Sequence, residues 1–342
     1  MSKAVVLRGK MDLKIDQAPL VKAGADDIVV RPRAVGICGS DIDMYRGVYT
    51  GFWHLPVIMG HEFSGEIVEV GSGIRGFETG DKVTAEEIHW CGYCRPCKAG
   101  LPNYCQNVEE LGFTTPGALA EEVIVHKKYI HKLPSNVTFE AGSLVEPASV
   151  AFTGIFVQGG GLVPGDFVVV FGGGPIGILS TILAKTAGAE VCVFEPNPWR
   201  RGIAKELGAD HVYDPLSSEP SKIVKDLTDG YGASMAVECS ANEKVVPQLI
   251  ECLRYKGNGV LVGMLEAPST VNGITFVKRG ISLVGSLGHS GHDTFPHVIN
   301  LIARKVIDPS KLISHRFSIW EPEKAFSFAV QRGESMKITL TQ

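Results

Sequence analysis

The segment that most constrains the fold is a glycine-rich turn in the middle of the chain, Gly172-Gly173-Gly174-Pro175-Ile176-Gly177. It follows an apolar run at 167–171 and precedes residues 177–187, whose apolar positions have helical spacing. In a strand–turn–helix of this pattern, the first glycine allows a tight turn and the second lets the backbone approach a pyrophosphate. The third lets the helix pack closely on the strand. Because the helix start offers free N–H groups to a diphosphate, the segment predicts a dinucleotide-binding unit.

The sequence around this turn alternates between strand and helix patterns. The strand candidates are separated by helical patterns at 177–187, 199–207 and 245–255. These strand candidates lie at 167–171, 190–194, 235–239, 260–263 and 281–284. Strands that alternate with helices predict a parallel sheet covered on both faces, in a doubly wound Rossmann arrangement.

The acidic residue that ends the second of these strands, Glu195, decides the expected cofactor. A carboxylate at this offset accepts the ribose hydroxyls of NAD and repels a 2′-phosphate, so NAD is expected and NADP is less favoured. Arg200 follows closely and could stack on the adenine or tolerate a phosphate. The residues assigned to the cofactor are Gly172, Gly174, Pro175, Ile176, Gly177, Glu195, Arg200, Val262 and Gly263. The alternative is a glycine turn that binds no ligand.

Residues on either side of this region follow a different sequence pattern. The first 150 residues are rich in strand patterns, at 28–35, 63–70 and 119–125, and the pattern changes after Glu146-Pro147. The C-terminal part has a helical pattern near 294–305 and a short strand at 337–340. We therefore predict an α/β chain in which a strand-rich domain, 1–149 and 287–342, is interrupted by the doubly wound domain, 150–286.

Four of the eight cysteines lie in a lobe at 91–105, as Cys91, Cys94, Cys97 and Cys105. Short C-x₂-C turns place sulfurs within reach of one ion, and Zn²⁺ accepts four thiolates tetrahedrally. A site closed by four sulfurs leaves no open position, so the expected zinc is structural. The alternative is an exposed lobe with incidental thiols.

A second metal site is suggested by Cys38 and by His61 with its neighbour Glu62. One sulfur, one nitrogen and one carboxylate oxygen suit a catalytic zinc whose fourth position is open to water or substrate. Each residue also has an ordinary alternative, since a single cysteine is usually a small buried apolar residue.

The whole chain resembles the medium-chain, zinc-containing alcohol dehydrogenase family. The resemblance is carried by GICGSD at 36–41, GHEFSGEIVEVG at 60–71, GDKV at 80–83, the cysteine lobe, LVEP at 144–147 and GGGPIG at 172–177. It implies a GroES-like catalytic domain beside the Rossmann domain, and hydride transfer between an alcohol and NAD. It also implies two zinc ions per chain.

The same resemblance assigns roles to single residues. Cys38 and His61 match the catalytic zinc ligands, and the third ligand matches either Glu62 or Glu146. Asp41 matches the residue that orients the histidine, and Ser40 matches the hydroxyl that relays the alcohol proton. Asp43 stands where the family often has a histidine, and a carboxylate suits this proton relay less well.

Within the family, Glu146-Pro147-Ala148-Ser149-Val150 is similar to the polyol and butanediol dehydrogenase branch. The stretch from Tyr45–Val48 through Gly51-Phe52, with Glu110–Thr114, is similar to aminocyclitol (2-deoxy-scyllo-inosamine) dehydrogenases. The expected substrate is a small polar alcohol or ketone, such as a polyol, sugar, vicinal diol or cyclitol. Alternatives are a threonine 3-dehydrogenase and a non-catalytic nucleotide-binding relative. Candidate pocket residues, each equally compatible with packing, are Tyr45, Trp53, His54 and Phe113.

Composition narrows the possible partners. The formal charge is −4, and there is no basic stripe to suggest nucleic-acid binding. Apolar runs stay well short of the ~18 residues of a membrane span. With no targeting signal recognised, we expect a cytoplasmic protein. Family resemblance implies a homodimer or homotetramer.

Overall fold

The computed structural model describes residues 2–18, 22–49, 51, 53–265, 267–289, 291–331 and 333–342. The chain forms two compact units: unit 1 comprises Met1–Glu146 and His289–Gln342, and unit 2 comprises Pro147–Gly288. The predicted fold class is confirmed, because unit 1 is rich in strands and unit 2 contains a parallel sheet. The predicted domain limits lie close to this division, and the role given to each domain stays a prediction.

Unit 2 is built on six parallel strands in the order β13-β12-β11-β14-β15-β16. The chain runs outward from β11 to β13 and then crosses to β14 on the other side of β11. Ligands of such sheets bind at the carboxyl ends of the strands, where the winding direction reverses. The strands are β11 (Phe167–Phe171), β12 (Glu190–Phe194), β13 (His211–Tyr213), β14 (Ala233–Glu238), β15 (Leu253–Leu261) and β16 (Ser282–Gly285).

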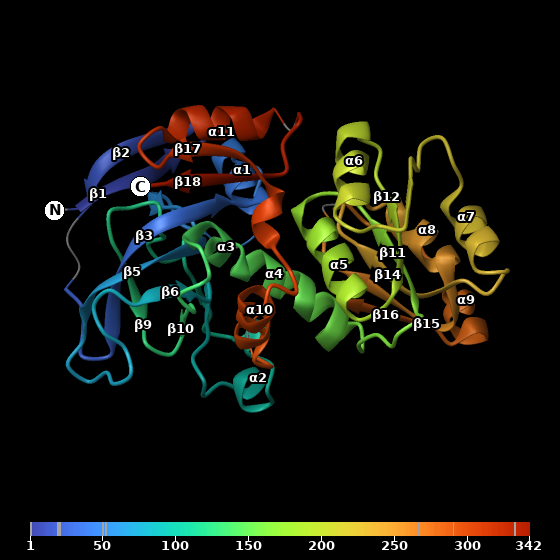
Figure 1. Ribbon diagram of the computed structural model, residues 1–342, viewed down its shortest axis with the longest axis horizontal. Coiled ribbons are helices and arrows are strands. Elements are labelled where there is room, and N and C mark those ends of the chain that lie inside the picture. Colours follow the sequence, from blue (N-terminus) through green and yellow to red (C-terminus); the bar gives the residue numbers. More distant parts are fainter. Residues whose placement is uncertain are drawn as a thin grey trace. The chain divides into compact units, whose positions relative to one another are not determined.

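Helices cover both faces of this sheet, with α5 and α6 on one face and α7, α8 and α9 on the other (Figure 1). This arrangement explains why β11 and β14 are buried at every position along their length. The helices are α5 (Pro175–Thr186), α6 (Pro198–Glu206), α7 (Pro220–Leu227), α8 (Val245–Cys252) and α9 (Gly273–Arg279).

Several predicted elements were wrong in their limits, among them the strand predicted at 260–263, which is only the end of β15. The helix predicted at 245–255 ends at Cys252, because Leu253 is extended and pairs with Ala233 as the first residue of β15. The strand predicted at 119–125 begins only at Val123. The carbonyl of Leu119 accepts from the N–H of Val5, so the chain first meets β1 before it joins β3.

The described residues of unit 1 form three sheets. The largest has the order β10-β6-β5-β3-β18-β17, with β9 also paired to β3; the others are β2-β1-β4 and β7-β8. Their strands are β1 (Ser2–Gly9), β2 (Asp12–Ala18), β3 (Asp27–Ile37), β4 (Val57–Ile58), β5 (Glu62–Val70), β6 (Lys82–Ala85), β7 (Ile88–His89), β8 (Glu109–Glu110), β9 (Val123–His126), β10 (Ile130–Lys132), β17 (Ile313–Ser318) and β18 (Lys337–Thr341).

The helices of unit 1 are short. They are α1 (Gly39–Arg46), α2 (Arg95–Lys98), α3 (Phe139–Ser143), α10 (Thr294–Ala303) and α11 (Pro322–Val330), with 3₁₀ turns at Pro102–Tyr104 and Pro309–Leu312. The division between the units falls within α4 (Val145–Phe152), which continues as a π-helix, Thr153–Gln158. Among the described residues, no helix is both long enough and apolar enough to span a membrane.

Candidate metal and cofactor sites

Cys38 lies at the junction of β3 and α1, after Ile37 and before Gly39. Its backbone N–H donates to Oδ2 of Asp41 at 2.9 Å, so the carboxylate caps the start of the helix. Asp41 is buried, and its other oxygen lies 3.6 Å from Nδ1 of His61. This distance is longer than a hydrogen bond. It nevertheless places the carboxylate beside the ring nitrogen that a metal-bound histidine usually presents to an acceptor.

The pairing of β5 with β3 brings the next two residues to Cys38. The register sets Glu62 opposite Gly36, two residues before the cysteine. A Cβ on Gly36 would lie 2.2 Å from Oε2 of Glu62, so this position needs glycine. One ligand atom from each of Cys38, His61 and Glu62 lies within 4.8 Å of the others. A thiolate, an imidazole and a carboxylate form a donor set that fits a catalytic zinc ion.

A second group of candidate ligands shares His61. One ligand atom from each of His61, Glu87 and Glu146 lies within 4.8 Å of the others. Nε2 of the fully buried His289 is 3.1 Å from Oε2 of Glu87 and 3.4 Å from Oε1 of Glu146. Burial and the nearby carboxylate of Glu87 raise the pKa of Glu146 well above its usual value. This pair of neighbouring carboxyl groups would be stabilised by a cation.

Glu62 has a cation of its own. Nζ of Lys337, on β18, donates to both carboxylate oxygens of Glu62 at 2.7 Å and to the carbonyl of Ile37 at 3.2 Å. Burial alone lowers the pKa of Lys337, but Glu62, Cys38 and Glu146 together more than offset this effect and the pKa is raised. The two carboxylates proposed as a third zinc ligand therefore differ, because Glu62 is paired with an ammonium group and Glu146 lies beside another carboxylate.

The two predicted relay residues lie on α1. Ser40 is the second residue of the helix and is half-buried. Asp43 follows one turn later, with Oδ1 3.7 Å from Nη1 of Arg46. Arg46 occupies the last turn of the same helix. The structure thus gives Asp43 a cationic neighbour on its own helix.

Aromatic rings and a further carboxylate surround the cysteine and histidine. The ring of Phe113 lies 4.8 Å from that of His61 and 5.5 Å from that of Tyr49. Burial, followed by the charge of Glu87, raises the pKa of Glu110 to about 7. Tyr45 instead packs in the core against Phe326, with ring centroids 5.3 Å apart. Of the two roles considered for Tyr45, core packing and lining a substrate pocket, the structure shows the packing role.

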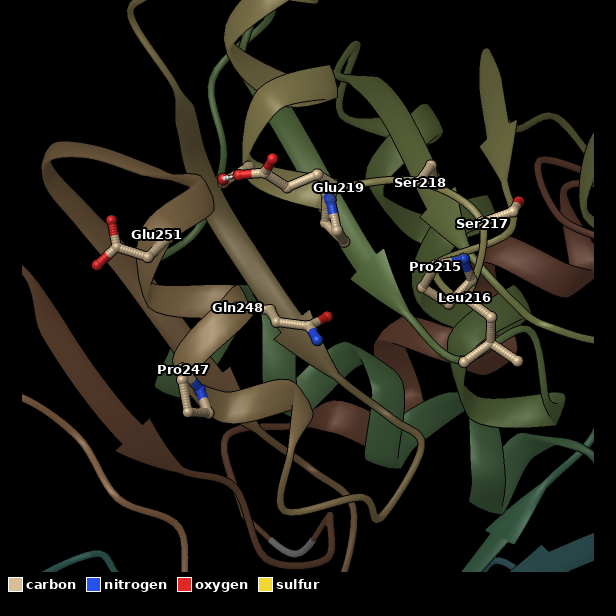
Figure 2. A pocket seen from close by; sticks show the side chains of 10 residues that line it. Pro215, Leu216, Ser217, Ser218, Glu219, Pro247, Gln248 and Glu251 are labelled. Carbon is tan, nitrogen blue, oxygen red and sulfur yellow. Dashed lines mark hydrogen bonds between the residues drawn. The ribbon is translucent and has the colours of Figure 1, made fainter.

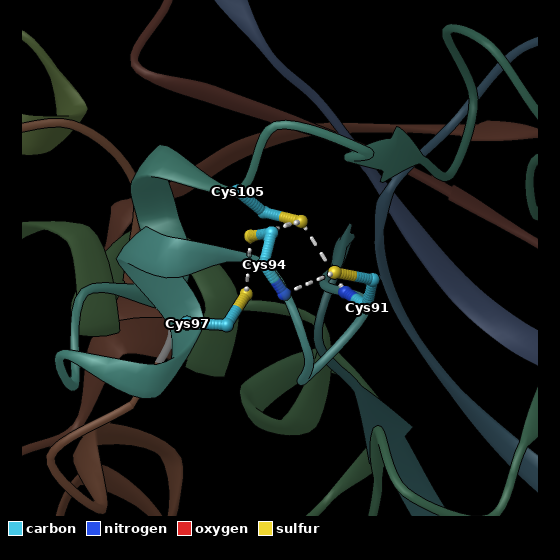
Figure 3. A group of neighbouring side chains, drawn as sticks. All are labelled: Cys91, Cys94, Cys97 and Cys105. Carbon is cyan, nitrogen blue, oxygen red and sulfur yellow. Dashed lines mark hydrogen bonds between the residues drawn. The ribbon is translucent and has the colours of Figure 1, made fainter.

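The four cysteines of the lobe converge on one point (Figure 3). Sγ of Cys94 lies 3.4 Å from that of Cys97 and 3.9 Å from that of Cys105. Four sulfurs bound to one zinc at about 2.3 Å would be separated by about 3.8 Å. Backbone N–H groups of Cys91 and Asn107 also donate to the sulfur of Cys105. The residues therefore fit a structural zinc ion.

The glycine-rich turn of unit 2 has the shape that a dinucleotide requires. Gly172 has a φ of +99°, which favours glycine. A Cβ on Gly177, in the first turn of α5, would lie 1.8 Å from the carbonyl oxygen of Gly172. Only glycine at this position lets the helix start so close to the turn. At Gly174, by contrast, a Cβ would meet nothing closer than Nη1 of Arg200 at 3.9 Å. This open position before Pro175 and Ile176 fits a diphosphate at the helix start.

Glu195 follows β12 and lies beside this turn. Its Oε2 accepts from the N–H of Gly173 at 2.6 Å, and its Oε1 accepts from the N–H of Asn197 at 2.8 Å. Each carboxylate oxygen can accept a further hydrogen bond, so contact with a ribose is compatible with this arrangement. Arg201 donates to the carbonyls of Glu195 and Pro196, whereas Arg200 lies near Gly174.

Val262 and Gly263 follow β15, and their N–H groups both donate to the carbonyl of Glu238 at 3.0 Å. A Cβ on Gly263 would lie 2.4 Å from Oε2 of Glu238, so glycine allows the ends of β14 and β15 to approach closely. These residues therefore lie at the carboxyl edge of the sheet, the edge that binds ligands in this fold.

An open pocket of about 580 Å³ in unit 2 is separate from all of these groups (Figure 2). It lies between residues 215–221, which lead into α7, and the side chains of Pro247, Gln248 and Glu251 on α8. No residue predicted for a metal or the cofactor lines it. Its size alone therefore gives it no role in the site.

Glu87, His289 and Lys337 are three site residues that the sequence did not reveal. Glu87 precedes β7, His289 begins the second segment of unit 1, and Lys337 begins β18. None belongs to a motif with ligand spacing. The one available signal was a lysine at the start of a strand otherwise rich in apolar and β-branched residues.

Two family models match the chain. The alcohol dehydrogenase GroES-like domain matches residues 24–135, and the zinc-binding dehydrogenase domain matches residues 175–304. The chain therefore belongs to the zinc-binding alcohol dehydrogenase family, and the predicted family is confirmed. It is an oxidoreductase that acts on CH–OH groups.

Individual relatives cover most of the chain. A scyllo-inosose 3-dehydrogenase of Thermotoga maritima is 43% identical over 320 residues, which are 86% of this chain and 81% of that protein. A sorbitol dehydrogenase of Halalkalibacterium halodurans is 35% identical over 96% of this chain and 95% of that protein. The crystal structure of a 2R,3R-butanediol dehydrogenase from Bacillus subtilis has a TM-score of 0.92 at 29% identity, with full coverage of both chains.

Proposed function

We propose that this chain interconverts a secondary alcohol and a ketone on a cyclitol or related polyol, with NAD as the hydride acceptor. The observation that carries the proposal is that Cys38, His61 and Glu62 bring ligand atoms within 4.8 Å of one another, and that His61 belongs to a second such group with Glu87 and Glu146. The relative named scyllo-inosose 3-dehydrogenase supports a cyclitol substrate. A zinc ion held here supplies Lewis acidity to the alcohol oxygen, and NAD accepts the hydride.

We infer that Glu146 is the third ligand, beside Cys38 and His61. Lys337 neutralises Glu62 through both carboxylate oxygens. Glu146 lies beside Glu87, and their repulsion would be relieved by a divalent cation. Asp41, with one carboxylate oxygen 3.6 Å from Nδ1 of His61, is the candidate for orienting the imidazole, and Ser40 is the candidate for passing the alcohol proton outward.

NAD is the proposed cofactor because Glu195 lies directly beside the glycine-rich turn. A carboxylate at this point accepts ribose hydroxyls and repels a 2′-phosphate. Gly172, Gly174, Pro175, Ile176 and Gly177 would hold the diphosphate through backbone N–H groups.

A homodimer through the edge of unit 2 is the proposed assembly. The edge strand β16 is only partly buried, and the side chains of Val271, Ile274 and Val277, in and before α9, are 40%, 54% and 83% exposed. An exposed strand edge and exposed apolar side chains in one unit favour association with a second copy. Light scattering of Val277→Glu should show a monomer where the parent chain is a dimer. Because none of the eight cysteines forms a disulfide, we also propose a cytoplasmic location.

The test of the proposed function compares Cys38→Ala with the parent enzyme. NADH formation should be measured with a panel of inositols, sorbitol, butanediol and threonine, and zinc should be counted per chain. We expect the parent to oxidise an inositol or another polyol, and the variant to lose turnover and one zinc ion while it still binds NAD. Turnover by Cys38→Ala equal to the parent's would exclude the proposed site. A preference for threonine would support the amino-alcohol alternative.

A further inference from the structure

We propose that Glu238 is a positioning residue for the nicotinamide half of NAD, and that it acts through Ser240 and Gly263 without direct contact with the nucleotide. The inference rests on the proposed function, because it concerns the same cofactor site. Glu238 is the last residue of β14 and its side chain is completely buried. It belongs to none of the ligand-binding motifs of the sequence, and the proposed hydride transfer leaves it without a role.

The place of Glu238 in the sheet is on the other side of β11 from Glu195. Glu238 pairs with Phe171 at the end of β11 and with Leu261 at the end of β15. Glu195, the candidate partner of the adenosine ribose, follows β12 on the opposite side of β11. Because the two halves of a dinucleotide lie on the two sides of this crevice, the ends of β14 and β15 border the nicotinamide half.

The side chain of Glu238 fixes the segment that follows β14. Its Oε1 accepts from the N–H of Ser240 at 2.6 Å and from the hydroxyl of Ser240 at 2.5 Å. This segment packs on the glycine-rich turn, since a Cβ on Gly172 would lie 3.0 Å from the carbonyl of Cys239 and from the backbone nitrogen of Ser240. Ser240 is exposed, so the buried Glu238 holds an exposed residue at the edge of the sheet where ligands bind.

Glu238 also fixes the segment that follows β15. Its carbonyl accepts from the N–H groups of Val262 and Gly263 at 3.0 Å, and its Oε2 lies where it would be 2.4 Å from a Cβ on Gly263. Among the described residues, this oxygen is buried without a hydrogen-bond partner. A buried oxygen without a partner costs stability, so its place against Gly263 points to a role other than folding. Glu238 thus joins the two backbone segments, 239–240 and 262–263, that border the nicotinamide half.

The experiment titrates the zinc-loaded enzyme calorimetrically with NAD and with AMP, which contains only the adenosine half. Glu238→Met removes both acceptor oxygens and keeps the length of the side chain. Ser240→Ala removes the donor hydroxyl, and Ser240→Thr keeps it. Ser234→Ala is the matched control, because Ser234 lies near the other end of β14 and donates to the carbonyl of Phe167 at 2.9 Å. Zinc content and melting temperature check that each variant is folded and loaded.

We expect Glu238→Met and Ser240→Ala to bind NAD about tenfold less tightly than the parent, the effect of one hydrogen bond, and to bind AMP as the parent does. Ser240→Thr and Ser234→Ala should bind both nucleotides as the parent does. An NAD affinity equal to the parent's in Glu238→Met and Ser240→Ala would overturn the inference, and so would an equal loss of affinity for NAD and AMP. The expected binding pattern in a parent that oxidises no alcohol would instead contradict the proposed function and leave this inference standing.

Discussion

Lys337 places its ammonium nitrogen 2.7 Å from each carboxylate oxygen of Glu62, although the two residues are 275 positions apart. Both side chains are almost completely buried, at 3% and 1% exposure. The same nitrogen donates to the carbonyl of Ile37, the residue before Cys38. One cation therefore ties β18 to the ends of β3 and β5 that carry the candidate zinc ligands.

Replacement of this lysine should destabilise unit 1. In Lys337→Met, the buried charge of Glu62 would lose its partner, and we expect the free energy of unfolding to fall by about 3–5 kcal/mol. Lys337→Arg keeps the charge and is the control. Denaturant titrations of both variants and of the double variant Lys337→Met/Glu62→Gln measure the effect. A Lys337→Met protein as stable as the parent would show that the pair contributes nothing to folding.

The two zinc ions should be separable by mutation. Cys97→Ala removes one of four thiolates, so we expect the loss of one zinc ion per chain and a lower melting temperature, since structural zinc contributes to folding. Cys192→Ala, which truncates a buried thiol in unit 2, should keep both ions. Elemental analysis gives the zinc count. A Cys97→Ala chain with two bound zinc ions would contradict the assignment of the lobe.

The cofactor preference should depend on Glu195. Removing its charge in Glu195→Gln ends the repulsion of a 2′-phosphate, and we expect the ratio of kcat/KM for NADP to that for NAD to rise at least about tenfold. Glu190→Gln, at the opposite end of β12, is the matched control. Steady-state rates with both nucleotides decide the matter, and an unchanged ratio would show that another residue discriminates between them.

The stability of unit 1 should depend on pH through Glu140. Its hydrogen bonds with Arg316, at 2.6 and 2.8 Å, lower the pKa of this carboxyl from 4.5. Because the folded state lowers this pKa, the contribution is complete above about pH 4.5 and is lost as the pH falls through the folded value. We expect Glu140→Gln to be less stable than the parent by up to about 1 kcal/mol at neutral pH, given partial exposure.

Thermal unfolding between pH 3 and pH 7 measures this difference. The gap between the parent and Glu140→Gln should close as the solution is acidified below pH 4.5. Glu69→Gln, which changes an exposed residue of β5, serves as the control for a general charge effect. A gap that widens towards low pH would have the wrong sign for this ion pair.

Local patterns predicted the parts of the fold that depend on local chemistry. The runs 167–171 and 190–194 coincide with β11 and β12, because buried parallel strands require continuous apolar residues. The end of α8 could not be predicted in this way. Leu253 continues the helical spacing of Val245–Cys252, and only its pairing with Ala233 makes it the start of a strand.

The site was predictable where motifs are contiguous and unpredictable where it depends on tertiary contacts. The sequence already contains Cys38, His61 and the two candidate carboxylates in recognisable segments. Glu87 and Lys337 lie in segments with no ligand spacing, and they reach the site through the β7–β8 pairing and the β18–β3 pairing. The folded chain, and not the sequence, therefore determines which of the two carboxylates lies beside a group of opposite charge.

The contact between Glu146 and His289 has an evolutionary consequence. These are the last residue of unit 1 before unit 2 and the first residue after it, and their side chains come within 3.4 Å. The polypeptide thus leaves unit 1 and returns to it at one place. Residues 147–288 are therefore a cassette, an inserted segment whose two ends lie close together. Under the proposed roles of the two units, exchanging that cassette between relatives should change the preference for NAD or NADP and leave Cys38, His61 and Glu146 in place.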